Sequence, residues 1–169
     1  WGNIDFLVHG IRFSNKDELR GKYYNTSSEN FNQTMHISCY SFTEACRLAE
    51  PIMNSGGSIL TLTYYGAEQV MPHYNVMGIA KAALETSVKY LSVDLGSKNI
   101  RVNAISPGPF PKPDVQQNTN FMNNLKKKIP LGRVGNPSEL KGVMMFLASN
   151  ASSFVTGENI HVDGGWSAC

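Results

Sequence analysis

Two tyrosines and one lysine lie close together in the middle of the chain, in the stretch YYGAEQVMPHYNVMGIAK at residues 64–81. Tyr74 and Lys81 are seven residues apart, so in a helix their side chains share one face. Tyr64 ends the β-rich run SILTLTY, and open α/β sheets bind ligands at the carboxyl ends of their parallel strands. The spacing therefore predicts that both phenols and the amine meet at one edge of a sheet.

These residue types suit a reaction in which an oxygen atom gains negative charge. A phenol can donate a hydrogen bond to such an oxygen, and a nearby ammonium group lowers the pKa of the phenol, which is about 10 when unperturbed. The amine can also donate to the hydroxyl groups of a bound cofactor. On spacing alone, an equally good interpretation packs both tyrosines in the core and leaves the lysine in solvent, because short motifs often match by chance.

The elements that must position these residues alternate along the chain. We expect strands at 4–9, 58–64, 100–106 and 157–165, and helices at about 26–53, 73–96, 121–129 and 138–149. The run at 4–9 is apolar enough to be buried on both faces, and the polar stretch FPKPDVQQNTN reads as a mobile loop. This order predicts an α/β fold, a Rossmann-like three-layer α/β/α domain with a parallel sheet covered on both faces.

Composition limits the classes of function. The 169 residues are 41% hydrophobic and 17% charged, which favours one folded domain over residues 1–169. A net charge of +2 gives no reason to expect nucleic acid as a partner, and no apolar run approaches the ~20 residues that span a membrane. Cys39, Cys46 and Cys169 have no metal-type spacing and the four histidines are dispersed, so we expect no metal site, no disulfide and a cytoplasmic setting.

Several blocks of sequence, taken in order, resemble the short-chain dehydrogenase/reductase superfamily and, more narrowly, its bacterial NADH-dependent enoyl-acyl-carrier-protein reductases. The matching blocks are FLVHGIRFS, ISCYSFTEA, GGSILTLTYYGAEQVMPHYNVMGIAKAALETSVKYLSVDLG, IRVNAISPGP and TGENIHVDGG. Ordinary members of the superfamily have the catalytic tyrosine four positions before the lysine, where this chain has Met77. A tyrosine seven positions before the lysine, with a second one ten residues earlier, is the pattern of the enoyl reductases.

The resemblance implies an enzyme of fatty acid biosynthesis that reduces trans-2-enoyl thioesters of acyl carrier protein or CoA with NADH, with NADPH as the alternative. Tyr74 would bind the thioester carbonyl, Lys81 would hold the nicotinamide ribose, and Tyr64 would support binding or protonation. The remaining cofactor positions would be Ile11, Phe110, Pro111, Lys112, Pro113 and Asp114, and the substrate positions would be Ser14, Met71 and Phe121. The family also implies a mobile substrate lid at 107–129 and a homotetramer.

Three departures from the family pattern keep other interpretations open. The chain runs from Trp1 directly into a strand, so we expect an upstream part with the glycine-rich turn and the first strands to be missing, and the cofactor site to be weakened. Lys112 replaces a threonine, and Arg12 occupies a normally small position. The blocks PLGRVGNP and VDGGW look more like ordinary short-chain dehydrogenases. The alternatives are a reductase of carbonyl or sugar substrates and an inactive fragment that keeps only subunit contacts.

Overall fold

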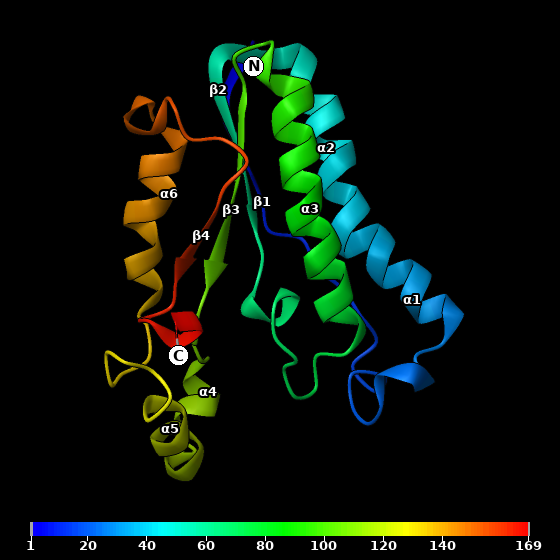
Figure 1. The fold of residues 1–169 in the computed structure, drawn as a ribbon, viewed down its shortest axis with the longest axis vertical. Helices are drawn as coiled ribbons and strands as arrows, with labels where there is room; N and C mark the ends of the chain where they lie inside the picture. Colours follow the sequence, from blue (N-terminus) through cyan, green and yellow to red (C-terminus); the bar gives the residue numbers. More distant parts are fainter. Residues whose placement is uncertain (1, 169) are drawn as a thin grey trace.

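The computed structural model describes residues 2–168, which form a parallel sheet with helices on both faces. Within these residues the strand order is β1-β2-β3-β4, with the bounds Ile4–His9, Met53–Leu62, Arg101–Pro107 and Asn159–Val162. One face carries α1 (Ser28–Met35), the π-helical turn His36–Tyr40, α2 (Ser41–Ala49) and α3 (Val76–Gly96), whereas α6 (Leu140–Ala148) covers the other (Figure 1). The predicted three-layer arrangement is confirmed.

All strands end at the same edge of the sheet. The register pairs His9 with Thr61, Leu62 with Ile105, and Pro107 with Val162. The segments that follow the strands therefore gather beyond this edge, where α4 (Pro113–Gln116) and α5 (Thr119–Lys126) also lie (Figure 1). This edge is where a ligand site is expected.

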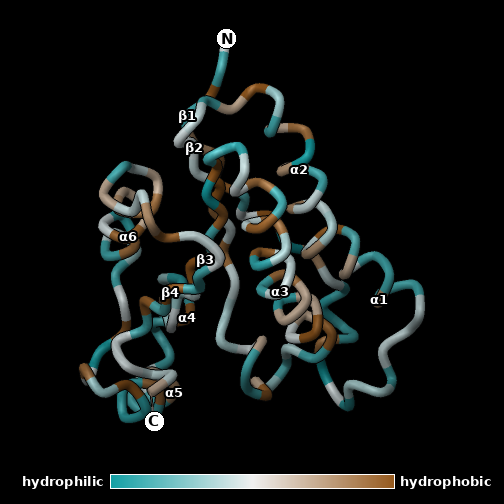
Figure 2. The backbone as a smooth tube through the Cα atoms, turned by 45° about the horizontal axis from the view of Figure 1, so that its top comes forward, coloured by the Kyte–Doolittle hydropathy of each residue, from teal (hydrophilic) through white to brown (hydrophobic). Residues whose placement is uncertain are grey.

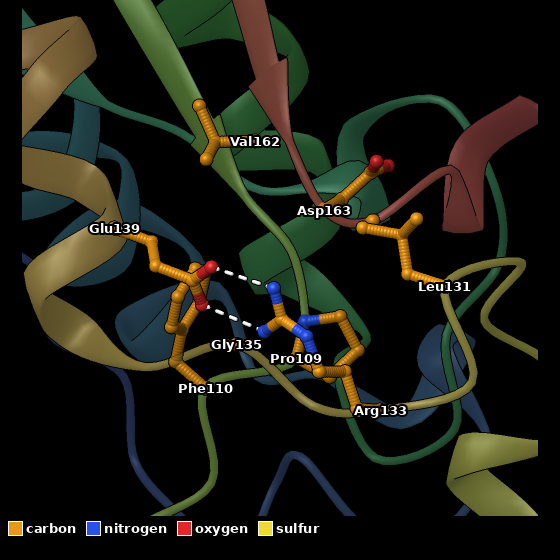
Figure 3. Close-up of a pocket in the computed structure, with 9 residues that line it drawn as sticks. Pro109, Phe110, Leu131, Arg133, Gly135, Glu139, Val162 and Asp163 are labelled. Atoms are coloured by element: carbon orange, nitrogen blue, oxygen red, sulfur yellow. Dashed lines mark hydrogen bonds and ion pairs between the residues drawn. The ribbon is translucent and has the colours of Figure 1, made fainter.

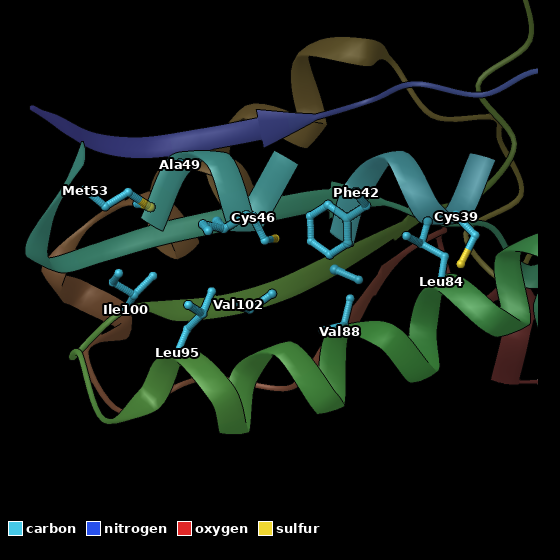
Figure 4. Close-up of a cluster of buried hydrophobic side chains, with 12 residues drawn as sticks. Cys39, Phe42, Cys46, Ala49, Met53, Leu84, Val88, Leu95, Ile100 and Val102 are labelled. Carbon is cyan, nitrogen blue, oxygen red and sulfur yellow. The ribbon is translucent and has the colours of Figure 1, made fainter. Parts of the chain in front are cut away.

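Two apolar clusters hold the layers together. The larger one packs α2 and α3 against the sheet and includes Phe42, Leu84 and Val88 (Figure 4). The smaller one packs α6 against the opposite face around Leu60, Ile105 and Leu147. In Figure 2 hydrophobic residues recur along the central strands and along α3, as expected for elements that bury one or both faces.

The cysteines of the larger cluster behave as small apolar residues. Cys39 and Cys46 are free and buried, and burial raises the pKa of Cys46 to about 12. Both thiols therefore contribute to packing, whereas Cys169 lies outside the described residues. None of the helices in residues 2–168 combines the length and the apolar character needed to cross a membrane.

The structure corrects four of the expected elements. Strand β2 begins at Met53 and not at the expected residue 58, because the helical path already stops at Glu50–Ile52, where Pro51 lacks an amide hydrogen. The run FPKPDVQQNTN contains α4, which begins at Pro113, a residue well suited to the first helical turn. The long central helix begins at Val76, so Tyr74 lies before it.

The fourth correction concerns β1, which is not buried on both faces. Phe6 and Val8 are 55% and 38% exposed, whereas His9 is buried. Within the described residues β1 pairs only with β2, and no described helix covers the face that Phe6 and Val8 occupy. The apolar run was therefore a correct sign of a strand but not of its burial.

Candidate active site

Tyr64, Tyr74 and Lys81 meet at the carboxyl edge of the sheet. Tyr64 follows the end of β2 in extended backbone, and its ring centroid lies 4.9 Å from that of Tyr74, with the ring planes inclined by 60°. Lys81 belongs to α3, and its Nζ donates a hydrogen bond to the carbonyl oxygen of Leu62 at 2.7 Å. The amine is thus held at the end of β2, two residues before Tyr64. The three groups lie at one edge as expected, but Tyr74 precedes α3, so it does not share a helix face with Lys81.

The amine of Lys81 is buried, although it is a charged group. The residue is 3% exposed, and burial, together with the positive charge of Arg12, lowers its pKa from 10.5 to about 8. An ammonium group has three N–H donors, and Leu62 uses one of them. Two donors therefore remain for a ligand, and the interpretation of Lys81 as a solvated helix residue is wrong.

The two phenols titrate differently from what the sequence suggested. Burial raises the pKa of Tyr74 and of Tyr64 above the ordinary value of 10. The nearby positive charge that opposes this rise at Tyr74 is that of Arg12, which also acts on Lys81. Both tyrosines are therefore neutral hydrogen-bond donors at physiological pH, and Arg12 is a second cationic group near this edge, besides Lys81.

An apolar cavity of about 660 Å³ opens beside Tyr64, and Tyr74 is not among the residues that line it. Four of the predicted residues other than Tyr64 line it together, namely Met71, Phe110, Pro111 and Phe121. Leu125 of α5 and Lys128 just after it complete the side formed by segment 107–129. A cavity of this size and lining suits a hydrophobic ligand of moderate length.

A second, smaller cavity lies beside Pro109 and Phe110, and the residues that line it support this segment (Figure 3). The guanidinium of Arg133 forms two hydrogen bonds to the Glu139 carboxylate, at 2.9 and 2.7 Å, and lowers the pKa of that carboxyl group to about 2. The amide of Gly135 donates to the carbonyl of Pro109, and a Cβ at Gly135 would lie 2.3 Å from the Phe110 ring. The close contact of Gly135 with the Phe110 ring, together with its bond to Pro109, therefore fixes the position of Phe110.

The other predicted residues lie outside the apolar cavity. Ile11 is 54% exposed in the segment after β1, and the hydroxyl of Ser14 is hydrogen bonded to Asn30 and Thr34. Lys112, Pro113 and Asp114 are exposed at the start of α4. The structure therefore groups Tyr64, Met71, Phe110, Pro111 and Phe121 around one cavity. The other predicted residues, namely Ile11, Ser14, Tyr74, Lys81 and residues 112–114, do not line it.

Sequence reasoning missed Trp166, which lines the cavity. Its ring lies 6.1 Å from that of Tyr64 and 5.8 Å from that of Tyr65, so it packs near both tyrosines. The carboxylate of Asp163 accepts hydrogen bonds from the amides of Gly165 and Ser167, which fixes the turn that presents the indole. An aromatic residue directly after a glycine pair was the only available signal. Among residues 2–168 no cluster of side chains could hold a metal ion.

The comparisons with known proteins agree with this geometry. Residues 1–167 match the family model described as enoyl-(acyl carrier protein) reductase. A curated relative, the enoyl-[acyl-carrier-protein] reductase [NADH] 1 of Rhizobium meliloti (strain 1021), is 56% identical over 98% of this chain and 62% of its own length.

Two solved structures are also similar. The Anaplasma phagocytophilum enoyl-(acyl-carrier-protein) reductase in complex with NAD superimposes with a TM-score of 0.93 at 50% identity, over 100% of this chain and 66% of that one. The Bacillus cereus enoyl-acyl carrier protein reductase with NADP⁺ and indole naphthyridinone gives 0.91 at 44% identity, over 99% of this chain and 66% of that one.

The chain thus spans less than two thirds of the length of the curated relative, while nearly all of its own length is matched. Met77, the position at which ordinary short-chain dehydrogenases have their tyrosine, is buried in the core at 1% exposure. The fold, the position of the tyrosine pair and the family match lead to one conclusion: the chain belongs to the enoyl-(acyl carrier protein) reductase family.

Proposed function

We propose that this protein reduces trans-2-enoyl thioesters with NADH, in the enoyl reduction step of fatty acid biosynthesis. The observation that carries the proposal is the pair of half-buried, neutral phenols in ring contact, together with the buried amine of Lys81 at the same carboxyl edge of the sheet. Such a pair donates hydrogen bonds to an oxygen that becomes negatively charged, which is the demand of conjugate reduction.

Each residue has a role that follows from its position. The Tyr74 hydroxyl donates to the thioester carbonyl oxygen and stabilises the enolate that forms when the β-carbon of the substrate gains hydride. Tyr64 supports binding or protonation of that enolate. Arg12 and Lys81 add positive charge to the same region, since the charge of Arg12 lowers the pKa of Lys81 and opposes the rise in the pKa of Tyr74. A low-dielectric surrounding strengthens all these interactions.

The residues at this edge fit the nicotinamide end of the cofactor. When bound, the reduced nicotinamide supplies the hydride. Lys81 retains two N–H donors after its bond to Leu62, and these suit the hydroxyl groups of a ribose. Ile11 and the segment 110–114 flank this position, at the ends of β1 and β3. NADH is the expected cofactor because the Rhizobium relative is named for it, with NADPH as the alternative.

The apolar cavity suits the acyl chain of the substrate, and its opening would face the acyl carrier protein or CoA that carries the chain. Met71, Phe110 and Phe121 offer the chain an apolar surface, and α4 and α5 cover the cavity as a lid over 107–129 that opens for entry. Ser14 stands at the periphery as a further substrate contact. The acyl group arrives as a thioester of acyl carrier protein or of CoA.

The proposal extends to assembly and location. Tyr90 and Val93 on the outer face of α3 are 73% and 78% exposed, which is unusual for apolar side chains on one helix and suits a subunit interface. We therefore propose a homotetramer, as the resemblance implied, and a cytoplasmic setting, as the cysteine pattern suggested.

The test uses purified protein, crotonyl-CoA and NADH, with acetoacetyl-CoA as the keto control. We expect NADH oxidation with the enoyl thioester only, and a loss of about a hundredfold or more in kcat for Tyr74→Phe, since one hydrogen bond to a developing oxyanion contributes on that order. Oxidation with the keto substrate alone would instead indicate a carbonyl reductase. No heat of NADH binding in calorimetry would indicate an inactive fragment.

A further inference from the structure

Tyr74 is flanked by two residues whose backbone is unusual for side chains other than glycine. His73 has a φ of +58°, and Asn75 has a φ of +39° with a ψ of −120°. The second pair of angles lies outside the small left-handed region that asparagine tolerates. Strain of this kind persists only where surrounding contacts impose it, and it concentrates at functional sites.

The side chain of Asn75 shows which contacts impose it. Asparagine directly before a helix usually accepts a hydrogen bond from an amide of the first turn. Asn75 makes no such bond to α3, and its Nδ2 instead donates to the carbonyl oxygen of Glu18 at 3.1 Å and of Gly21 at 3.5 Å. The residue therefore gives up the ordinary cap of its own helix in order to hold the loop after β1.

That loop is itself anchored at its far end. The Glu18 carboxylate accepts hydrogen bonds from the amide and the hydroxyl of Ser27, at 2.8 and 2.9 Å, and Ser27 is the N-cap of α1. Asn75 thus binds to a fixed structure and not to a free loop. The same loop carries Ile11, Arg12 and Ser14, which border the proposed site.

The ring of Tyr74 is confined on its other side. A Cβ at Gly66 would lie 2.5 Å from the Cδ1 of Tyr74, and a Cβ at Gly78 would lie 2.6 Å from the Gly66 carbonyl oxygen. With no spare space there, the direction of the phenol depends on the backbone of residues 73–75. If Asn75 relaxed to helical angles, the Cα–Cβ bond of Tyr74 would point elsewhere.

We propose that Asn75 is a positioning residue, which holds the Tyr74 phenol at the site by tying the start of α3 to the loop at 18–21. The inference rests on the proposed function for its catalytic consequence, but the placement of the phenol can be measured without any activity. The positive φ of Asn75 and its two donated hydrogen bonds suggest this role, so their loss should change the environment of Tyr74.

The test compares Asn75→Gly with Asn99→Gly. Glycine accepts positive φ without strain, so Asn75→Gly removes the two side-chain bonds and leaves the backbone permissible. Asn99 is the matched control, because it also has a positive φ, of +57°, and its side chain also donates a hydrogen bond, to Ser55. This bond is exposed, and Asn99 is not part of the proposed site. Readouts are kcat and KM for crotonyl-CoA and the titration of the Tyr74 phenol by NMR of ring-labelled tyrosine, assigned with Tyr74→Phe.

We expect Asn75→Gly to lower kcat about tenfold or more with a smaller change in KM, and to move the Tyr74 titration down toward pH 10 as the phenol becomes exposed. Asn99→Gly should match wild type in both. An unchanged Tyr74 titration in folded Asn75→Gly overturns the inference, as does an equal effect at Asn99. If the titration moves as expected while the wild type reduces no enoyl thioester, the inference stands and the proposed function fails.

Discussion

Replacing Lys81 by methionine should change how the stability of the protein depends on pH. The buried amine has a pKa of about 8, against an ordinary value of 10.5 for a solvated lysine. Between these values the unfolded chain binds more protons than the folded protein, so the free energy of unfolding rises with pH across this window. Methionine has a similar length but no proton to lose, and it removes this dependence.

The size of the effect follows from the same values. A fall from 10.5 to about 8 corresponds to roughly 3 kcal/mol, at about 1.4 kcal/mol for each pKa unit. The free energy of unfolding of the wild type, minus that of Lys81→Met, should therefore rise by about 3 kcal/mol between pH 7 and pH 10.5. At neutral pH the free energies of unfolding of the two proteins should differ less than at pH 10.5. Methionine removes the cost of burying a charge but leaves the Leu62 carbonyl unpaired, which costs about 1–3 kcal/mol.

The assay is urea unfolding of both proteins at intervals across this pH window. The raised pKa values of Tyr64 and Tyr74 lower stability above about pH 10, but both tyrosines are present in each protein and cancel in the difference. Lys89→Met is the matched control, because Lys89 is exposed on the same helix. A difference that stays constant with pH would refute the reasoning, since the amine would then not be buried as a charge. Lys81→Met should also abolish enoyl reduction at every pH.

Further substitutions test other parts of the site and its support. Gly66→Ala places a Cβ against the Tyr74 ring and should cost about 1–3 kcal/mol in urea unfolding and lower kcat, whereas Gly96→Ala, with open space around it, should not; equal effects would contradict the packing argument. Arg101→Met removes the buried guanidinium that binds Ser152 and the carbonyls of Leu147 and Ser149, and should cost about 2–4 kcal/mol; a loss below the error of the measurement would show that these bonds do not hold the end of α6. Arg12→Gln removes a positive charge and should raise the pKa of Lys81, seen by NMR of its Nζ; a fall would place Arg12 away from the amine.

Much of the fold was predictable because its signals are local. The apolar runs at 4–9 and 58–64 and the spacing of buried residues along α3 identify strands and a helix, and their alternation leaves few topologies other than a parallel sheet. Tyr64, Tyr74 and Lys81 were found from residue type and spacing for the same reason. Their meeting at one edge follows from the parallel direction of the strands.

The remaining features depend on contacts between distant segments. The start of α3 after Tyr74, and not before it, depends on the bond from Asn75 to the carbonyl of Glu18, 57 positions earlier, which no local pattern encodes. The exposure of Phe6 and Val8 depends on what lies beside β1, and composition alone cannot reveal it.

The sequence by itself determined most strands and helices, their order and the chemical groups available for catalysis, because these follow from short-range propensity and side-chain chemistry. Only the tertiary structure decided the state of those groups. It buried the amine of Lys81 and lowered its pKa, raised the pKa of both phenols, and brought Trp166 near Tyr64, although the two are far apart in the sequence. Charge and solvation depend on everything that surrounds an atom, and that surrounding exists only once the chain has folded.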